Sequence, residues 1–199
     1  MFIDLSVLLN EQTPVYPGDP KTAIKPAGVL AKDGWCDHYV SVGTHVGTHI
    51  DAPMHMIESG KSLDKFELDR FAGSAQCIDV SDGFDAVKTA GIQEGGIVLF
   101  CTKMSDKYFD KAYYENYPVM SEEVANYLVT KKLKMVGLDA CSVDNKDDFP
   151  IHKILLGNDI LIIENLTNMI QLIGKEFKLY ALPIKLGLDG APARVVAEL

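Results

Sequence analysis

Short runs rich in Val, Ile and Leu recur from one end of the chain to the other, and they limit the folds that it can adopt. In several of them the apolar residues are consecutive, which is the pattern of strands buried on both faces of a sheet. None approaches the roughly 20 residues that span a bilayer, so no membrane partner is expected. The runs predict strands at Phe2–Leu5, Tyr39–Val42, Gln76–Val80, Ile97–Phe100, Met135–Leu138, Ile160–Ile163 and Leu179–Leu182.

Helix signals lie between the predicted strands. Ser121 is an N-cap residue with acids in the turn that follows, and it predicts a helix to about Lys131. Pro150 opens a shorter helix that Gly157 would stop, and residues 84–90 form a weaker third candidate. Strands that alternate with helices predict an α/β fold with a mixed β-sheet and flanking helices, as one domain over residues 1–199.

The composition restricts the partners and the compartment. A formal net charge of −9 with scattered lysines disfavours a nucleic-acid partner, because such binding needs clustered cations. The N-terminus lacks the basic and apolar regions of a signal peptide, which predicts a cytoplasmic protein. The cysteines form no C-x-x-C pair, so we expect reduced and mostly buried thiols at Cys36, Cys77, Cys101 and Cys141.

A dense cluster of metal-ligand residues lies within residues 43–55. His45, His49 and His55 occur there with Asp51, and histidine with carboxylate is the donor set of many catalytic metal sites. The alternative is a set of separate histidines, each bonded to a backbone group. Such a concentration of ligands in eleven residues favours a shared metal site.

The spacing restricts the local conformation of such a site. Two nitrogens on one zinc ion can be only about 4 Å apart, whereas an extended chain would separate His45 from His49 by about 13 Å. A helix continued to Asp51 would rotate the carboxylate to the far side. We therefore predict a helical turn or coiled loop over residues 45–49, then an extended step in which His49 and Asp51 share a face. Pro53 would redirect the chain so that His55 returns toward the site.

Three further residues are weaker candidates. His152 lies on the short helix predicted from Pro150, where a surface histidine is the simpler interpretation. Glu164 follows the apolar run 160–163 directly, at the carboxyl end of a strand, where open α/β sheets bind ligands. His38, just before a predicted strand, is expected to be structural or to line a pocket.

At these residues the sequence resembles the putative cyclase family of metal-dependent hydrolases, which includes bacterial kynurenine formamidase (arylformamidase) and isatin hydrolase. The family pattern H-x-G-T-H-x-D-x-P-x-H matches His45 to His55 in full. The likeness extends over nearly the whole chain, including the segments 13–19 and 190–194, and the family also has a later histidine followed twelve residues on by a glutamate, as in His152 and Glu164. It implies a swivelling β/β/α type of fold and homodimers or larger homo-oligomers.

The resemblance also implies a site with two divalent metal ions, with zinc as the first expectation and manganese as the alternative. His45, His49 and Asp51 would hold the first ion and His152 the second, with Asp51 and Glu164 bridging both. His55 would be the general acid/base. Tyr16 stands where kynurenine formamidases have a tryptophan that contacts substrate, a departure that leaves the substrate less certain than the chemistry.

The charges of such a site favour hydrolysis of an amide by a metal-bound hydroxide. Because an arylamine leaves readily, an aryl formamide such as N-formylkynurenine, an intermediate of tryptophan catabolism, is the expected small-molecule substrate. Hydrolysis of another cyclic or aryl amide, such as an isatin-like ring, is the alternative. A non-catalytic metal-binding module is a third possibility, and it would need a closed coordination shell.

Overall fold

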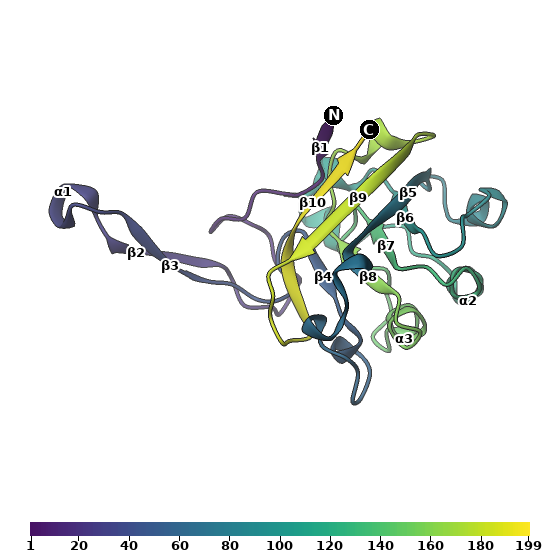
Figure 1. The fold of residues 1–199 in the computed structure, drawn as a ribbon, viewed down its shortest axis with the longest axis horizontal. Helices are drawn as coiled ribbons and strands as arrows, with labels where there is room; N and C mark the ends of the chain where they lie inside the picture. Colours follow the sequence, from purple (N-terminus) through teal and green to yellow (C-terminus); the bar gives the residue numbers. More distant parts are fainter.

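The computed structural model describes residues 1–199, and one large sheet dominates it (Figure 1). Its strands and α-helices are β1 (Phe2–Asp4), β2 (Ala23–Gly28), α1 (Leu30–Asp33), β3 (Asp37–Ser41), β4 (His49–Asp51), β5 (Ala72–Asp79), β6 (Ile97–Cys101), α2 (Glu122–Thr130), β7 (Met135–Leu138), α3 (Pro150–Leu156), β8 (Leu161–Glu164), β9 (Glu176–Pro183) and β10 (Gly190–Glu198). Short 3₁₀ helices lie at Pro53–His55, Leu63–Lys65, Leu68–Phe71, Asp85–Thr89, Met104–Lys107, Lys111–Tyr114 and Met169–Leu172. The predicted α/β class with a mixed sheet and flanking helices is confirmed.

The large sheet closes on itself. Its strand order is β1-β10-β4-β8-β7-β6-β5-β9, and β9 pairs in addition with β10. Strands β5 to β8 run parallel to one another in the order β5-β6-β7-β8, whereas β4, β9 and β10 make antiparallel pairs. The closing strand β10 spans the ring, because its first residues pair with β4 and its later residues with β9 and β1.

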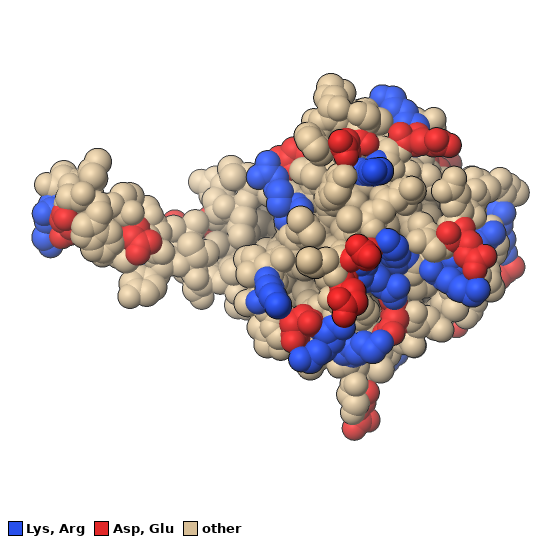
Figure 2. Space-filling view, in the orientation of Figure 1, with Lys and Arg blue, Asp and Glu red and all other residues tan.

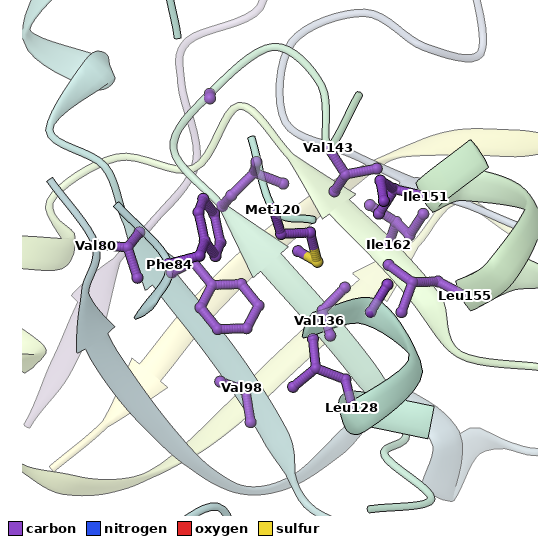
Figure 3. Close-up of a cluster of buried hydrophobic side chains, with 14 of the residues drawn as sticks. Val80, Phe84, Val98, Met120, Leu128, Val136, Val143, Ile151, Leu155 and Ile162 are labelled. Carbon is purple, nitrogen blue, oxygen red and sulfur yellow. The ribbon is translucent and has the colours of Figure 1, made fainter. Parts of the chain in front are cut away.

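The parallel strands are buried on both faces, which explains their consecutive apolar residues. Val98 and Val136 point to an outer core of 25 buried residues, which α2 and α3 cover (Figure 3). Their neighbours Leu99 and Met135 point to the opposite face, into a second core of 23 buried residues. Successive strand residues alternate between faces, so each strand supplies both cores.

Every predicted strand is present, but β2, β4 and β10 were not predicted as strands. The helices predicted to begin after Ser121 and at Pro150 are α2 and α3. The weaker helix at residues 84–90 is a 3₁₀ helix at Asp85–Thr89. No helix is both long and apolar enough to cross a membrane.

Strands β2 and β3 form a separate two-stranded hairpin that projects far from the body (Figure 1). The short helix α1 at its tip buries no residue. We call residues 20–43 the arm. Cys36 lies in the arm and is exposed, whereas the other three cysteines are buried, and all four thiols are free.

Candidate metal centre

The loop before β4 brings the first histidines together. Residues 44–48 form a turn and bends rather than an extended strand, and Gly47 has a φ of 63°, a left-handed conformation that favours glycine. His49 then begins β4. The structure thus has the coiled loop and the extended step that the spacing predicts.

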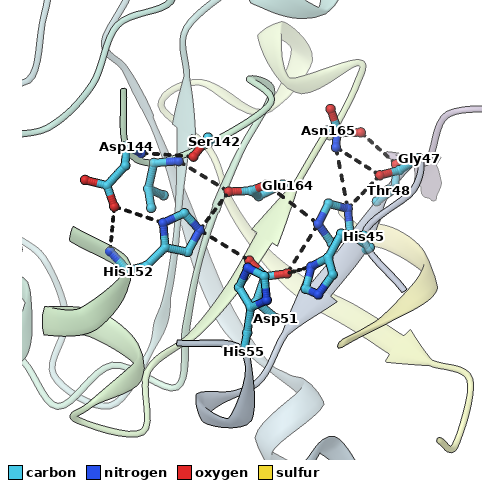
Figure 4. A network of polar contacts seen from close by, with 12 residues as sticks. His45, Gly47, Thr48, Asp51, His55, Ser142, Asp144, His152, Glu164 and Asn165 are labelled. Atoms are coloured by element: carbon cyan, nitrogen blue, oxygen red, sulfur yellow. Dashed lines mark hydrogen bonds and ion pairs between the residues drawn. The ribbon is translucent and has the colours of Figure 1, made fainter. Parts of the chain in front are cut away.

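His45, His49 and Asp51 converge on one another, and Figure 4 shows His45 and Asp51 close together. Asp51 Oδ1 lies 2.8 Å from His45 Nδ1 and 3.2 Å from His49 Nε2. The two imidazole rings stand edge to face with centroids 5.1 Å apart. His49 and Asp51 share a face of β4, as predicted.

The neighbouring strand supplies Glu164. β8 pairs with β4 in the register His49 opposite Glu164, so the last residue of β8 faces the site. Glu164 Oε2 lies 3.6 Å from His49 Nε2.

Helix α3 supplies His152, which is buried rather than on the helix surface. Its Nε2 lies 3.4 Å from Glu164 Oε1 and 3.7 Å from Asp51 Oδ2. Asp144 fixes the ring, because its Oδ2 accepts a hydrogen bond from His152 Nδ1 at 2.9 Å. The Asp144 carboxylate also accepts from the backbone N–H groups of Ile151 and His152 and so anchors the first turn of α3. No sequence pattern pointed to Asp144 as part of the site.

These polar residues are almost inaccessible to solvent. His49, Asp51, His152 and Glu164 are between 1% and 5% exposed. His49 Nε2 and Asp51 Oδ2 have no hydrogen-bond partner, and a buried polar atom without a partner is costly. A cation among them would satisfy both atoms.

The donor atoms fall into three overlapping groups, one of which is the half-buried set His45, His55 and Asp189. Of the other two, one contains His45, His49 and Asp51, and the other contains Asp51, His152 and Glu164. Within each group the potential ligand atoms all lie within 4.8 Å of one another. Asp51 belongs to both groups, so this arrangement fits two adjacent cations that share one carboxylate.

The electrostatics of the cluster agree with a cation site. Burial raises the pKa of Glu164, and the nearby Asp51 carboxylate raises it further. Burial alone would lower the pKa values of His49 and His152, but carboxylates outweigh burial and raise both. Without a cation the cluster therefore retains protons, and metal ions would displace them.

His55 returns to the site as predicted, through the 3₁₀ helix Pro53–His55. Its ring lies over that of His45, with centroids 3.9 Å apart and an angle of 31° between the planes. Burial lowers the pKa of His55, and the neighbouring His45 and His152 add to this effect against the opposing effect of Asp51. His55 therefore favours the neutral form, which can accept a proton.

Asp189 is a second residue that the sequence analysis missed. Its Oδ2 lies 2.8 Å from His45 Nε2 and 3.6 Å from His55 Nδ1. It immediately precedes β10, whose first residue, Gly190, pairs with Asp51. A side chain at Gly190 would come within 2.8 Å of the His45 ring, so glycine is required for this close approach. In the sequence, only the family resemblance of residues 190–194 pointed to the part of the chain that contains Asp189.

A pocket of about 440 Å³ opens over the cluster. His45, His49, His55, His152 and Glu164 line its polar part. Tyr16, Tyr114 and Phe149 line another part, and Tyr16 packs edge to face on Tyr114 with ring centroids 6.1 Å apart. The expectation for His38 was wrong, because His38 is exposed on β3 in the arm and lines no part of this pocket.

Comparisons with known proteins agree with this architecture. Residues 3–145 match the family described as "Putative cyclase". The kynurenine formamidase of Salinibacter ruber is 32% identical over 207 residues, covering 98% of this chain and 95% of that protein. A solved structure described as a potential metal-dependent hydrolase with cyclase activity is 31% identical, with a TM-score of 0.83 over 99% of this chain and 96% of that chain.

A further solved structure, of an isatin hydrolase with the product analogue thioisatinate, has a TM-score of 0.88 over 100% of this chain and 92% of that chain. Its identity of 23% establishes a shared fold only. The protein is thus an α/β protein in which a closed mixed sheet carries a buried cluster of histidines and carboxylates. The chain belongs to the putative cyclase family.

Proposed function

We propose that this protein is a metal-dependent amide hydrolase that cleaves an aryl formamide such as N-formylkynurenine. One observation carries the proposal: a single pocket combines two buried donor groups with aromatic side chains and with His55. The named relatives support hydrolysis, and a kynurenine formamidase matches nearly the full length of the chain.

The residues present fit two divalent cations. His45, His49 and Asp51 would hold one, and His152 the other, with Asp51 and Glu164 between them. Neutral imidazoles and carboxylates suit zinc and manganese alike. When bound, divalent cations supply Lewis acidity toward a carbonyl oxygen and lower the pKa of water.

The protein's own side chains would orient the substrate and transfer a proton. Tyr16, Tyr114 and Phe149 provide aromatic faces against which an aryl ring can pack. His55 lies in the pocket wall, and its Nδ1 is 3.6 Å from Asp189, too far for a strong hydrogen bond. A neutral His55 can take a proton from the attacking water and pass it to the departing arylamine nitrogen.

A closed metal-binding module is less consistent with this geometry. Its ligands would form a complete shell with no access, whereas His45 and His55 here line an open pocket. Access for a small molecule is what an enzyme requires and a structural site does not.

The test is hydrolysis of N-formylkynurenine and of isatin by the same preparation, with metal content measured in parallel. We expect turnover of N-formylkynurenine that a chelator abolishes and added zinc or manganese restores. Faster hydrolysis of isatin would assign the site to cyclic amides instead. A preparation that holds stoichiometric metal and hydrolyses neither compound would contradict the proposed function.

A further inference from the structure

A third donor group, formed by His45, His55 and Asp189, lies beside the two groups that are proposed to hold the catalytic cations. Its three potential ligand atoms also lie within 4.8 Å of one another. It differs from the other groups in access. The side chains of His45, His55 and Asp189 are 18%, 24% and 34% exposed, whereas Asp51 and Glu164 are buried. A cation can therefore reach this group directly from solvent.

The separation of His55 from Asp189 fits a shared ion better than a hydrogen bond. His55 Nδ1 lies 3.6 Å from Asp189 Oδ2, which is beyond the range of a hydrogen bond. Two donor atoms on one tetrahedral zinc ion, with bonds of about 2.0 to 2.2 Å, are about 3.4 Å apart. The observed distance is close to that value, so one zinc ion can contact both atoms without a large movement of either side chain.

His45 closes one side of the group. Its Nε2 lies 2.8 Å from the same Asp189 oxygen, and its ring lies over that of His55 with centroids 3.9 Å apart. The opposite nitrogen, Nδ1, faces Asp51 and is placed to hold the first cation of the buried centre. While it does so, His45 Nε2 keeps its proton and donates it to Asp189. His55 and Asp189 are then left as the ligands for a further ion, with water completing its shell.

We propose that His55 and Asp189 form a third cation site, which binds zinc when zinc is in excess and thereby inhibits the enzyme. The effect of this ion on turnover rests on the proposed function, whereas its binding does not. An imidazole that binds an ion through one nitrogen carries its proton on the other and has no lone pair left to accept another proton. An ion on His55 Nδ1 therefore removes the proton acceptor that amide hydrolysis requires.

Ligand number and charge both make the third site weaker than the buried centre. The site has two protein ligands, whereas each of the other donor groups has three. Two divalent cations in the centre would repel a third, and the single carboxylate of Asp189 offsets only part of that repulsion. The third ion should therefore bind at a higher zinc concentration than the first two, as a separate step of a titration.

The donor atoms of the third site favour zinc over manganese. Imidazole nitrogen binds divalent metals in an order that places zinc well above manganese, and manganese prefers oxygen ligands. One imidazole and one carboxylate, partly exposed to water, thus hold zinc more tightly than manganese. Excess zinc should inhibit the enzyme, and the same concentration of manganese should not.

The rest of the chain has no comparable set of donors. No further group of three His, Cys, Asp or Glu side chains brings its ligand atoms this close together. Figure 2 shows acidic side chains beside basic ones over the body, rather than gathered into a patch that would adsorb cations. Glu94, for example, pairs with Lys132, and Asp79 pairs with Lys103. Zinc bound beyond two ions per chain can therefore be assigned to the third donor group.

Zinc content after equilibrium dialysis tests the site without any assay of hydrolysis. Wild-type protein should hold two ions per chain at low free zinc and a third at higher free zinc. His55→Ala should bind the same two and not the third, because His55 is not a ligand of the buried centre. Asp189→Asn, at saturating zinc, should also lack the third ion. His38→Ala is the matched control, because His38 is exposed in the arm, and it should bind three.

Hydrolysis measured over the same zinc series tests the inhibition. Turnover of N-formylkynurenine by the wild type should rise as the first two ions bind. It should then fall by about 10²- to 10⁴-fold as the third binds, to the level of His55→Ala, because the contribution of the proton acceptor is lost. Manganese at the same concentrations should give the rise without the fall.

The ion counts and the rates separate this proposal from the proposed function. A wild type that stops at two ions, or a third ion that His55→Ala also binds, would overturn the site. A third ion that leaves turnover unchanged would overturn its effect on His55. If the protein hydrolyses neither N-formylkynurenine nor isatin, the proposed function fails, and the difference in ion count between wild type and His55→Ala still decides whether the third site exists.

Discussion

The metal centre and the arm differ in what they bury: the metal centre buries ionisable side chains, whereas the arm exposes apolar ones. The metal centre buries four ionisable side chains almost completely and leaves two of their polar atoms without partners. The arm leaves five large apolar side chains about half or more exposed and buries almost nothing. A cation would complete the first region, whereas the second presents apolar surface to solvent.

The two regions also differ in how they are held. β4, β8 and α3 fix the metal centre, and backbone pairing sets the positions of His49 and Glu164. Only β2 and β3 hold the arm, in a sheet of their own. The metal centre should thus keep its shape without cations, whereas the arm should depend on a second chain of the homo-oligomer that the family resemblance implies. The following experiments test that difference.

The largest effect is expected for Asp51→Ala. Asp51 belongs to both donor groups, so its loss removes a ligand from each cation at once. Metal content and N-formylkynurenine hydrolysis should both fall to background. Elemental analysis and the hydrolysis assay check this, and circular dichroism should show the same fold. Full activity in this variant would exclude Asp51 as the shared ligand.

A large effect on turnover alone is expected for His55→Ala. His55 lies beside the donor groups and is proposed to transfer a proton, a role that typically raises the rate by about 10²- to 10⁴-fold. Turnover should fall by that factor while the metal content stays unchanged. His38→Ala is the control, because His38 is exposed in the arm, and it should retain full turnover. Loss of metal in His55→Ala would make His55 a ligand instead.

Asp189→Asn should weaken metal binding by about 10- to 100-fold, the usual cost of removing a carboxylate that orients a histidine ligand. Asp189 accepts a hydrogen bond from His45 Nε2, which leaves His45 Nδ1 directed at Asp51 and the site. Competition with a chelator measures the affinity. Asp82→Asn, at an exposed position away from the site, should bind metal as the wild type does. Unchanged affinity in Asp189→Asn would show that Asp189 does not orient His45.

The metal affinity should also depend on pH. Burial lowers the pKa of His45, but Asp51 and Asp189 outweigh burial and raise it to about 9. Below that pH the metal-free His45 carries a proton that must leave before it can coordinate. Affinity should therefore fall as pH falls from 9 to 7, by about tenfold per pH unit for each proton released. Titrations at several pH values check the sign, and a flat profile would contradict the raised pKa.

The two regions differed in how far the sequence could predict them. The ligand spacing restricted residues 45–55 so strongly that the coiled loop, the extended step and the return of His55 could all be predicted from local geometry. Apolar runs predicted the parallel strands, because burial on both faces leaves a continuous pattern. Both features could be predicted because each depends only on residues that are close together in the sequence.

Long-range pairing could not be predicted in the same way. Asp189 meets His45 only because β10 pairs with β4, a contact between residues about 140 positions apart. His38 was misplaced because nothing in its neighbours shows that residues 20–43 leave the body. The arm strands also have a weak pattern, since neither face of that hairpin packs on a core.

The smallest effect is expected from protein concentration. If the arm depends on a second chain, unfolding also separates two chains, so the melting temperature should rise as the protein is concentrated from 1 to 100 µM. In Leu30→Glu, at the tip of the arm, the melting temperature should not change with concentration.

Added metal at about 100 times its dissociation constant should stabilise both proteins equally, by about 2.7 kcal/mol, because the metal centre needs no partner. Metal stabilisation confined to the wild type would mean that the arm and the metal centre are coupled.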